Sequence, residues 1–141
     1  MDGVTFFVPG IPVAQPRQRS RVMHVGGKVM AMNYTPADSP VNAFKAAVRM
    51  AWPKDTPATD GPVHIVAAFL FPRPKSKTKK SRNFREWKAG KPDIDNLFKS
   101  LADALTGLAW KDDSQVAMAT LTKRIAGDGD IAGVTVSIGS L

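Results

Sequence analysis

Residues 63–71, with the sequence VHIVAAFLF, restrict the possible folds of this chain more than any other stretch. All of them except His64 are apolar, so both alternating faces of an extended strand would be apolar. Strands with two apolar faces are typical of central positions in a sheet. We therefore expect a central strand here, in a sheet that packs against helices and other structure instead of facing water.

Two segments have the periodicity of helices. The first would start at Ser39 and Pro40 and end before Pro53. Its apolar positions are Val41, Phe44, Val48, Ala51 and Trp52. A second helix would begin near Asp95. Its apolar stripe consists of Leu97, Leu101, Ala104, Leu105 and Leu108.

Short β-branched or alternating stretches predict further strands at residues 4–8, 115–124 and 134–138. A hairpin is expected around Gly26-Gly27. These elements together predict an α+β fold in which two main helices pack on a mixed β-sheet. We expect residues 1–141 to form a single compact domain.

Composition excludes several classes of protein. The 141 residues contain no cysteine, which removes disulfides, thiolate metal sites and cysteine nucleophiles. No apolar run approaches the roughly 18 residues that cross a bilayer, and the first residues do not resemble a signal peptide. We expect a soluble, cytoplasmic protein without membrane contact.

The net charge of +8 is concentrated in residues 73–91, called the basic segment below. It holds nine of the 20 basic residues and, in Glu86, one of the 12 acidic ones. Such a segment can bind DNA phosphates with little sequence preference, and Phe84 and Trp87 within it could stack on bases or sugars. The alternative is a solvated loop. The predicted DNA-binding residues are Arg73, Lys75, Lys77, Lys79, Lys80, Arg82 and Arg85, with Arg17 and Arg19 from a second arginine stretch.

Aspartates flank the second helix: Asp93 and Asp95 at its start, Asp112 and Asp113 after its end. In a continuous helix Asp93 and Asp95 would lie about 200° apart. If Asp93 stays extended after Pro92, both carboxylates can converge at the helix N-terminus, where the dipole favours negative charge. Asp113 would lie roughly 20 Å away along the helix axis. Spacing alone leaves two interpretations open, a Mg²⁺ site of short carboxylates or a set of helix caps and loop residues.

The sequence KPDIDNLFKSLADALTG at residues 91–107, followed by WKDDSQV at residues 110–116, closely resembles the signature of the RusA family of Holliday junction resolvases. Weaker likeness extends to Gly10-Ile11-Pro12, Tyr34-Thr35-Pro36 and FPRPKS at residues 71–76. The two aspartate motifs are specific in combination, and the likeness covers most of the chain.

The resemblance implies a homodimeric, Mg²⁺-dependent endodeoxyribonuclease of mixed α/β structure that cuts four-way DNA junctions by paired nicks. Asp93, Asp95 and Asp113 match the family's catalytic, metal-binding aspartates, and Lys99 matches a functionally important lysine. Lys99 would face the charge that develops on the phosphate; alternatively it forms an ion pair with Asp95 or Asp103. Dimerisation could also bring together carboxylates that one helix keeps apart.

Two other functions stay open. A nuclease of the same chemistry could act on other branched DNA, such as flaps. A non-catalytic, basic nucleic-acid-binding module would use the aspartates only as caps. Its DNA binding would survive Asp93→Asn and would need no Mg²⁺.

Overall fold

A computed structural model describes residues 3–16, 19–34, 39–75 and 83–141 of the chain. These parts contain two α-helices, seven strands and a one-turn 3-10 helix. In chain order the elements are β1 (Val4–Pro9), β2 (Arg19–Val25), β3 (Lys28–Tyr34), α1 (Pro40–Ala51), β4 (Val63–Phe71), β5 (Glu86–Trp87), α2 (Ile94–Leu105), the 3-10 helix η2 (Asp113–Gln115), β6 (Val116–Ile125) and β7 (Gly133–Ser140).

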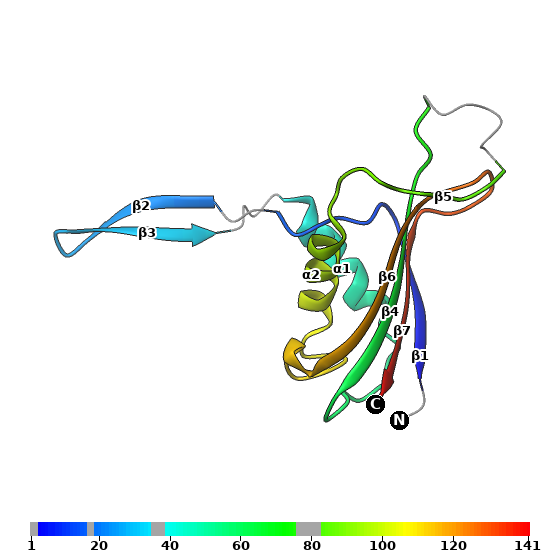
Figure 1. The fold of residues 1–141 in the computed structure, drawn as a ribbon. Helices are drawn as coiled ribbons and strands as arrows, with labels where there is room; N and C mark the ends of the chain where they lie inside the picture. Colours follow the sequence, from blue (N-terminus) through cyan, green and yellow to red (C-terminus); the bar gives the residue numbers. More distant parts are fainter. Residues whose placement is uncertain (1–2, 17–18, 35–38, 76–82) are drawn as a thin grey trace.

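Five strands form one mixed sheet in the order β1-β7-β4-β6-β5. The middle strand, β4, pairs antiparallel with β7 and parallel with β6 (Figure 1). The pairs β1–β7 and β5–β6 are antiparallel. The predicted central strand and the predicted α+β class are both confirmed.

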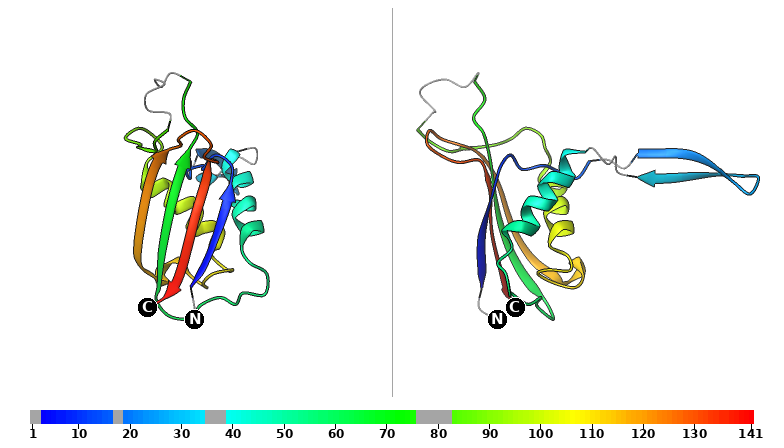
Figure 2. Two further views of the ribbon diagram at one scale, coloured as in Figure 1. Left: turned by 90° about the vertical axis from the view of Figure 1, so that its right-hand side faces the viewer. Right: turned by 180° about the vertical axis from the view of Figure 1, so that it is seen from behind.

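Both helices lie on the same face of this sheet (Figure 2). α1 starts at Pro40, and it ends where the Trp52 amide donates to the Val48 carbonyl at 3.1 Å. The two helices contact each other. Between helices and sheet, the Phe6 and Trp52 rings meet edge to face with centroids 5.6 Å apart. In the described part of the chain, neither helix has the length and apolarity needed to span a bilayer.

The core lies between the helices and the face of the sheet that they cover. Its largest fully buried side chains are Trp110, Phe69, Ile65, Leu97, Leu101 and Leu105. The leucines come from the predicted apolar stripe of α2. Burying that stripe in the core fixes the rotation of α2, and therefore decides which of its residues face water.

Within the described part of the chain, no helix packs on the opposite face of the sheet (Figure 2). On β4, Ile65 and Ala67 are fully buried, whereas Val66 and Ala68 are exposed. The expectation that the sheet packs on both faces is therefore wrong for the described part of the chain. This face carries Ala68 and its partner Thr135 on β7, but also the exposed apolar side chains of Phe7 and Met118.

Strands β2 and β3 form a separate hairpin that stands away from the sheet (Figures 1 and 2). Gly26 and Gly27 have φ angles of 57° and 77°, which a two-residue hairpin turn requires and glycine adopts without a steric penalty. The predicted hairpin is confirmed. Val22 and Val29 on it are exposed.

Candidate active site

The start of α2 presents two exposed carboxylates. Asp93 occupies the N-cap position with an extended backbone (φ −69°, ψ 141°), and Asp95 lies in the first turn. The expected local backbone is therefore confirmed, because Asp93 stays extended after Pro92 and the helix begins at Ile94. The positive end of the helix dipole stabilises negative charge at this position.

The Asp93 side chain makes no capping hydrogen bond. The helix is instead closed at this point by the Asp93 backbone carbonyl, which accepts from the Leu97 amide at 3.1 Å. The hydrogen bonding therefore gives no support to the interpretation of Asp93 as a side-chain cap. Its carboxylate oxygens are not used by the amides of α2.

Lys123 on β6 ties the loop before Asp93 to the sheet. Its Nζ atom donates to the carbonyl oxygens of Gly90 and Pro92, at 2.8 and 2.9 Å. Its own carbonyl accepts from the Lys88 amide at 3.1 Å. Lys123 therefore holds both ends of the 88–92 loop and, through that loop, the start of α2.

Residues 11–16 run beside α2. The Gln15 amide donates to the Asn96 carbonyl at 2.9 Å, and the buried Ser100 hydroxyl donates to the Val13 carbonyl at 2.6 Å. Since Asn96 follows Asp95, the segment that leads to Arg17 and Arg19 passes next to the carboxylates. Of the predicted residues in that stretch, Arg17 lies outside the described residues, as does the side chain of Arg19, whose backbone starts β2.

Lys99 is exposed on α2, one turn after Asp95. Asp103, one of its two possible ion-pair partners, instead lies 3.6 Å from Nζ of Lys45 on α1. Within the described ranges, Lys99 forms no ion pair with either aspartate. Its ammonium group is therefore not used in holding the fold together.

Asp112 and Gln115 form a capping box around η2. Asp112 Oδ1 accepts from the Ser114 amide at 2.9 Å, and Gln115 Oε1 accepts from the Asp112 amide at 3.1 Å. The hydrogen bond from the Ser114 amide lowers the pKa of the Asp112 carboxyl. Gln115 Nε2 also donates to the carbonyls of Thr59 and Gly61, at 2.8 and 2.9 Å. These two motif residues therefore build the turn itself.

Asp113, the first residue of η2, is exposed. It follows the far end of α2, a helix of 12 residues and hence about 18 Å long, from the end that carries Asp93 and Asp95 (Figure 1). Among the described residues, no three His, Asp or Glu side chains are close enough to hold a metal ion together. A single copy of the chain therefore brings Asp93 and Asp95 to one helix end and leaves Asp113 at the other.

Two arginines of the basic segment are tied into the fold. Arg73 donates from Nε to the Ala126 carbonyl at 3.0 Å and from Nη2 to the Phe84 carbonyl at 2.7 Å, and only 11% of its side chain is exposed. Lys75 is exposed. The remaining predicted residues of this segment, Lys77, Lys79, Lys80 and Arg82, lie outside the described residues. Arg73 thus has a structural role that its place in a basic run did not reveal.

Arg85 forms a two-pronged pair with Asp130. Its Nε and Nη2 atoms lie 3.0 and 3.2 Å from the two carboxylate oxygens, and Asp130 Oδ2 also accepts from the Gly127 amide at 2.8 Å. The hydrogen bond from Arg85 lowers the pKa of the Asp130 carboxyl. Asp130 is therefore more than a turn residue, because it joins the basic segment to the β6–β7 connection.

Comparison with known proteins assigns these motifs to a family. The model of the family described as Endodeoxyribonuclease RusA matches residues 9–139, nearly the whole chain. This chain belongs to the RusA family. The match contains Asp93, Asp95, Lys99 and Asp113, together with Lys123.

Two known proteins are similar in sequence to this chain. The uncharacterized protein YqaN of Bacillus subtilis (strain 168) is 36% identical over 131 residues, which cover 87% of this chain and 88% of YqaN. The crossover junction endodeoxyribonuclease rusA of Lactococcus phage r1t is 31% identical over 75 residues, which cover 52% of this chain and 53% of the phage protein.

Sequence reasoning missed the residues that position the RusA motifs. Lys123 reads as an ordinary cation in a predicted strand, and its role depends on the 88–92 loop lying beside β6. Gln115 offered one signal, its position three residues after Asp112, which is the spacing of a capping box.

Proposed function

We propose that this protein is a Mg²⁺-dependent endodeoxyribonuclease that resolves four-way DNA junctions by paired phosphodiester hydrolysis. The observation that carries the proposal is the pair of exposed aspartates at the start of α2. Asp93 makes no capping hydrogen bond, and the loop before it is fixed to the sheet by Lys123. In an endodeoxyribonuclease family, carboxylates that the fold itself does not use are good candidates for chemistry.

The donor chemistry at this helix end fits Mg²⁺. This ion takes a small number of carboxylates and completes its shell with water and substrate phosphate oxygens, so Asp93 and Asp95 would be two suitable protein ligands. When bound, Mg²⁺ supplies positive charge that polarises a phosphodiester and makes a water molecule more acidic. The two aspartates would hold the ion at a position fixed by the backbone of the helix start.

Lys99 would act directly on the phosphate. Its ammonium group lies on the exposed side of α2, one turn beyond Asp95, and no described ion pair occupies it. A cation at this position would stabilise the negative charge that grows on the phosphate oxygens during hydrolysis. Exposed cations of the basic segment, among them Lys75, would bind the flanking phosphates.

A second copy of the chain would supply the third carboxylate. Asp113 is exposed at the opposite end of α2 from Asp93, so one chain alone does not assemble all three aspartates. In a two-fold symmetric dimer, Asp113 of each copy could approach Asp93 and Asp95 of the other. Two such sites would match the two symmetric strands that are cut in a four-way junction.

The test is cleavage of an end-labelled four-way junction beside flapped DNA and linear duplex of the same sequence, with Mg²⁺ or with EDTA. We expect paired nicks at the junction with Mg²⁺ alone, and none with Asp93→Asn or Asp95→Asn although DNA binding persists. Asp128→Asn, which removes the same charge from an exposed turn, serves as the control and should cut normally. Preferential cutting of flaps would instead support a branched-DNA nuclease of other specificity. Binding without cleavage under any condition would support a non-catalytic module.

A further inference from the structure

Trp87 is an exposed aromatic ring supported from behind by a cation. It lies on the two-residue edge strand β5 opposite Arg124 of β6, and the Arg124 guanidinium carbon is 4.2 Å from the centre of its ring. Trp87 is nevertheless 69% exposed, whereas the other two tryptophans of the chain, Trp52 and Trp110, are buried. One face of the indole is therefore covered by Arg124, and the other is open to a ligand.

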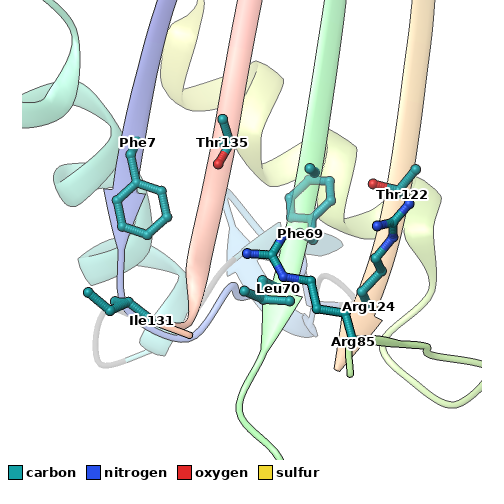
Figure 3. A pocket seen from close by; sticks show the side chains of 9 residues that line it. Phe7, Phe69, Leu70, Arg85, Thr122, Arg124, Ile131 and Thr135 are labelled. Atoms are coloured by element: carbon teal, nitrogen blue, oxygen red, sulfur yellow. The ribbon is translucent and has the colours of Figure 1, made fainter. Parts of the chain in front are cut away.

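A hollow of about 190 Å³ on the open face of the sheet is lined in part by Arg124, the residue that supports this ring. Figure 3 shows Arg85 and Arg124 on one side of it, Phe7 and Ile131 on the other, and the hydroxyl groups of Thr122 and Thr135. Within the described part of the chain, the buried Nε atom of Arg124 has no hydrogen-bond partner. The hollow thus combines guanidinium and hydroxyl donors with apolar surface, as binding of an anionic, partly aromatic ligand requires.

This surface is connected to the candidate active site through two consecutive residues of β6. Side chains of neighbouring strand residues point to opposite faces of a sheet. Lys123 therefore holds the loop before Asp93 on the helix-covered face, while Arg124 supports Trp87 on the open face. Asp93 lies six positions after Trp87, which limits the distance between their backbones to about 20 Å. This is roughly six base steps of stacked DNA at about 3.4 Å each.

We propose that Trp87 and the adjoining hollow bind an unpaired nucleotide of branched DNA. The base stacks on the open face of the indole, and its phosphate lies against Arg85 and Arg124. Every base has a π face, so stacking of this kind tolerates any sequence, and a fully paired duplex does not present such a face. The subsite rests on the proposed function in that DNA is its ligand, and it would favour branch points over duplex.

The three tryptophans make this subsite directly measurable. We would titrate the protein in EDTA with a thymidine oligonucleotide and with an abasic oligonucleotide of the same length, following tryptophan fluorescence and the anisotropy of end-labelled DNA. We expect the thymidine strand to quench the fluorescence saturably and the abasic strand to leave it unchanged. Trp87→Phe should abolish the quenching but keep most of the affinity, because a ring remains. Trp87→Ala should weaken binding of the thymidine strand about tenfold.

The matched control is Met118→Ala, another exposed apolar residue on the open face of β6, which should bind both strands as the unchanged protein does. Equal quenching and affinity for the two strands, or full affinity in Trp87→Ala, would overturn the subsite. The assay contains no Mg²⁺ and requires no cleavage. Loss of quenching in a protein that still cuts junctions would therefore refute the subsite alone, whereas quenching in a protein that never cuts would refute the proposed catalysis alone.

Discussion

The Nζ atom of Lys123 donates a hydrogen bond of 2.9 Å to the carbonyl oxygen of Pro92, the residue directly before Asp93. A second bond from the same atom reaches the Gly90 carbonyl at 2.8 Å. Hydrogen bonds to a charged donor contribute about 1.5–3 kcal/mol each. Strand β6, which lies between β4 and β5 in the sheet, thus fixes the loop from which the candidate catalytic helix begins.

Replacing Lys123 by methionine keeps most of the side-chain volume and removes both hydrogen bonds. We expect the single-turnover cleavage rate to fall by about ten- to a hundredfold, because a displacement of about 1 Å at a catalytic group has an effect of this size. The dissociation constant for junction DNA in EDTA should change less than it would on removal of a lysine that binds a DNA phosphate. The measurement is a comparison of rate and affinity on the same junction.

The control for Lys123→Met is Lys54→Met, which removes the same charge from an exposed loop. It should leave the cleavage rate unchanged. If Lys123→Met weakened binding and left the rate of bound enzyme intact, Lys123 would be a DNA contact and not a positioning residue.

Mixed dimers test whether the aspartates act across two chains. Asp93→Asn and Asp113→Asn proteins should each be inactive alone. In a mixed dimer, one of the two sites would combine an intact Asp93 with an intact Asp113 from the other copy. We therefore expect mixing to restore single nicks at the junction without paired resolution.

The matched control for this experiment mixes the Asp93→Asn protein with the Asp95→Asn protein. Both changes lie at the same helix end, so no mixed dimer would contain a complete site, and activity should not return. Failure of the first mixture to recover nicking, although subunit exchange is verified by differently tagged chains, would place all essential carboxylates within one chain.

Substitution of Gln115 should lower the stability of the fold. It accepts from the amides of Lys111 and Asp112, and it donates to the carbonyls of Thr59 and Gly61. Gln115→Leu removes these four hydrogen bonds, and we expect it to lower the free energy of unfolding by about 1–3 kcal/mol. Urea unfolding measures this change, and Lys111→Met, an exposed neighbour, should leave the stability within about 0.5 kcal/mol. An equal loss in both variants would show that Gln115 does not anchor η2.

Features that depend on residues close together in the sequence were predictable. The α2 stripe of Leu97, Leu101 and Leu105 has helical spacing, and it is buried as expected. Asp93 is extended directly before the helix, an arrangement that the sequence allowed as one of its alternatives. The aspartate and lysine motifs were recognisable because their spacing in the chain is itself the signal.

The contacts that cross the chain were not predictable in the same way. Lys123 and Pro92 are 31 residues apart, and Arg85 and Asp130 are 45 residues apart. Their meeting depends on strand order, which hydrophobic periodicity does not specify. The open face of the sheet was missed for a related reason, since Val66 and Ala68 look buried in a sequence although no described element covers them. Most of the contacts at the site that the sequence did not predict therefore depend on pairing between residues far apart in the chain.

Asp130 restrains a predicted DNA-binding residue, so its removal should strengthen DNA binding. Asp130→Asn eliminates a negative charge and frees the Arg85 guanidinium, which is held at 3.0 and 3.2 Å. We expect a few-fold tighter binding to junction DNA and a plot of log affinity against log salt that is steeper by about 0.9, the value for one additional phosphate contact. Asp128→Asn removes the same charge from the same turn without touching Arg85, and it should leave this slope unchanged.

The pH dependence of DNA binding tests whether Asp130 is the group that restrains Arg85. Arg85 lowers the pKa of the Asp130 carboxyl, so the pair is complete above the ordinary aspartate pKa of about 3.9 and is lost only as pH falls through the lowered value. The affinity gain of Asp130→Asn over the unchanged protein should therefore be constant between about pH 5 and pH 8. A gain that disappears on acidification within this range would mean that another group restrains Arg85.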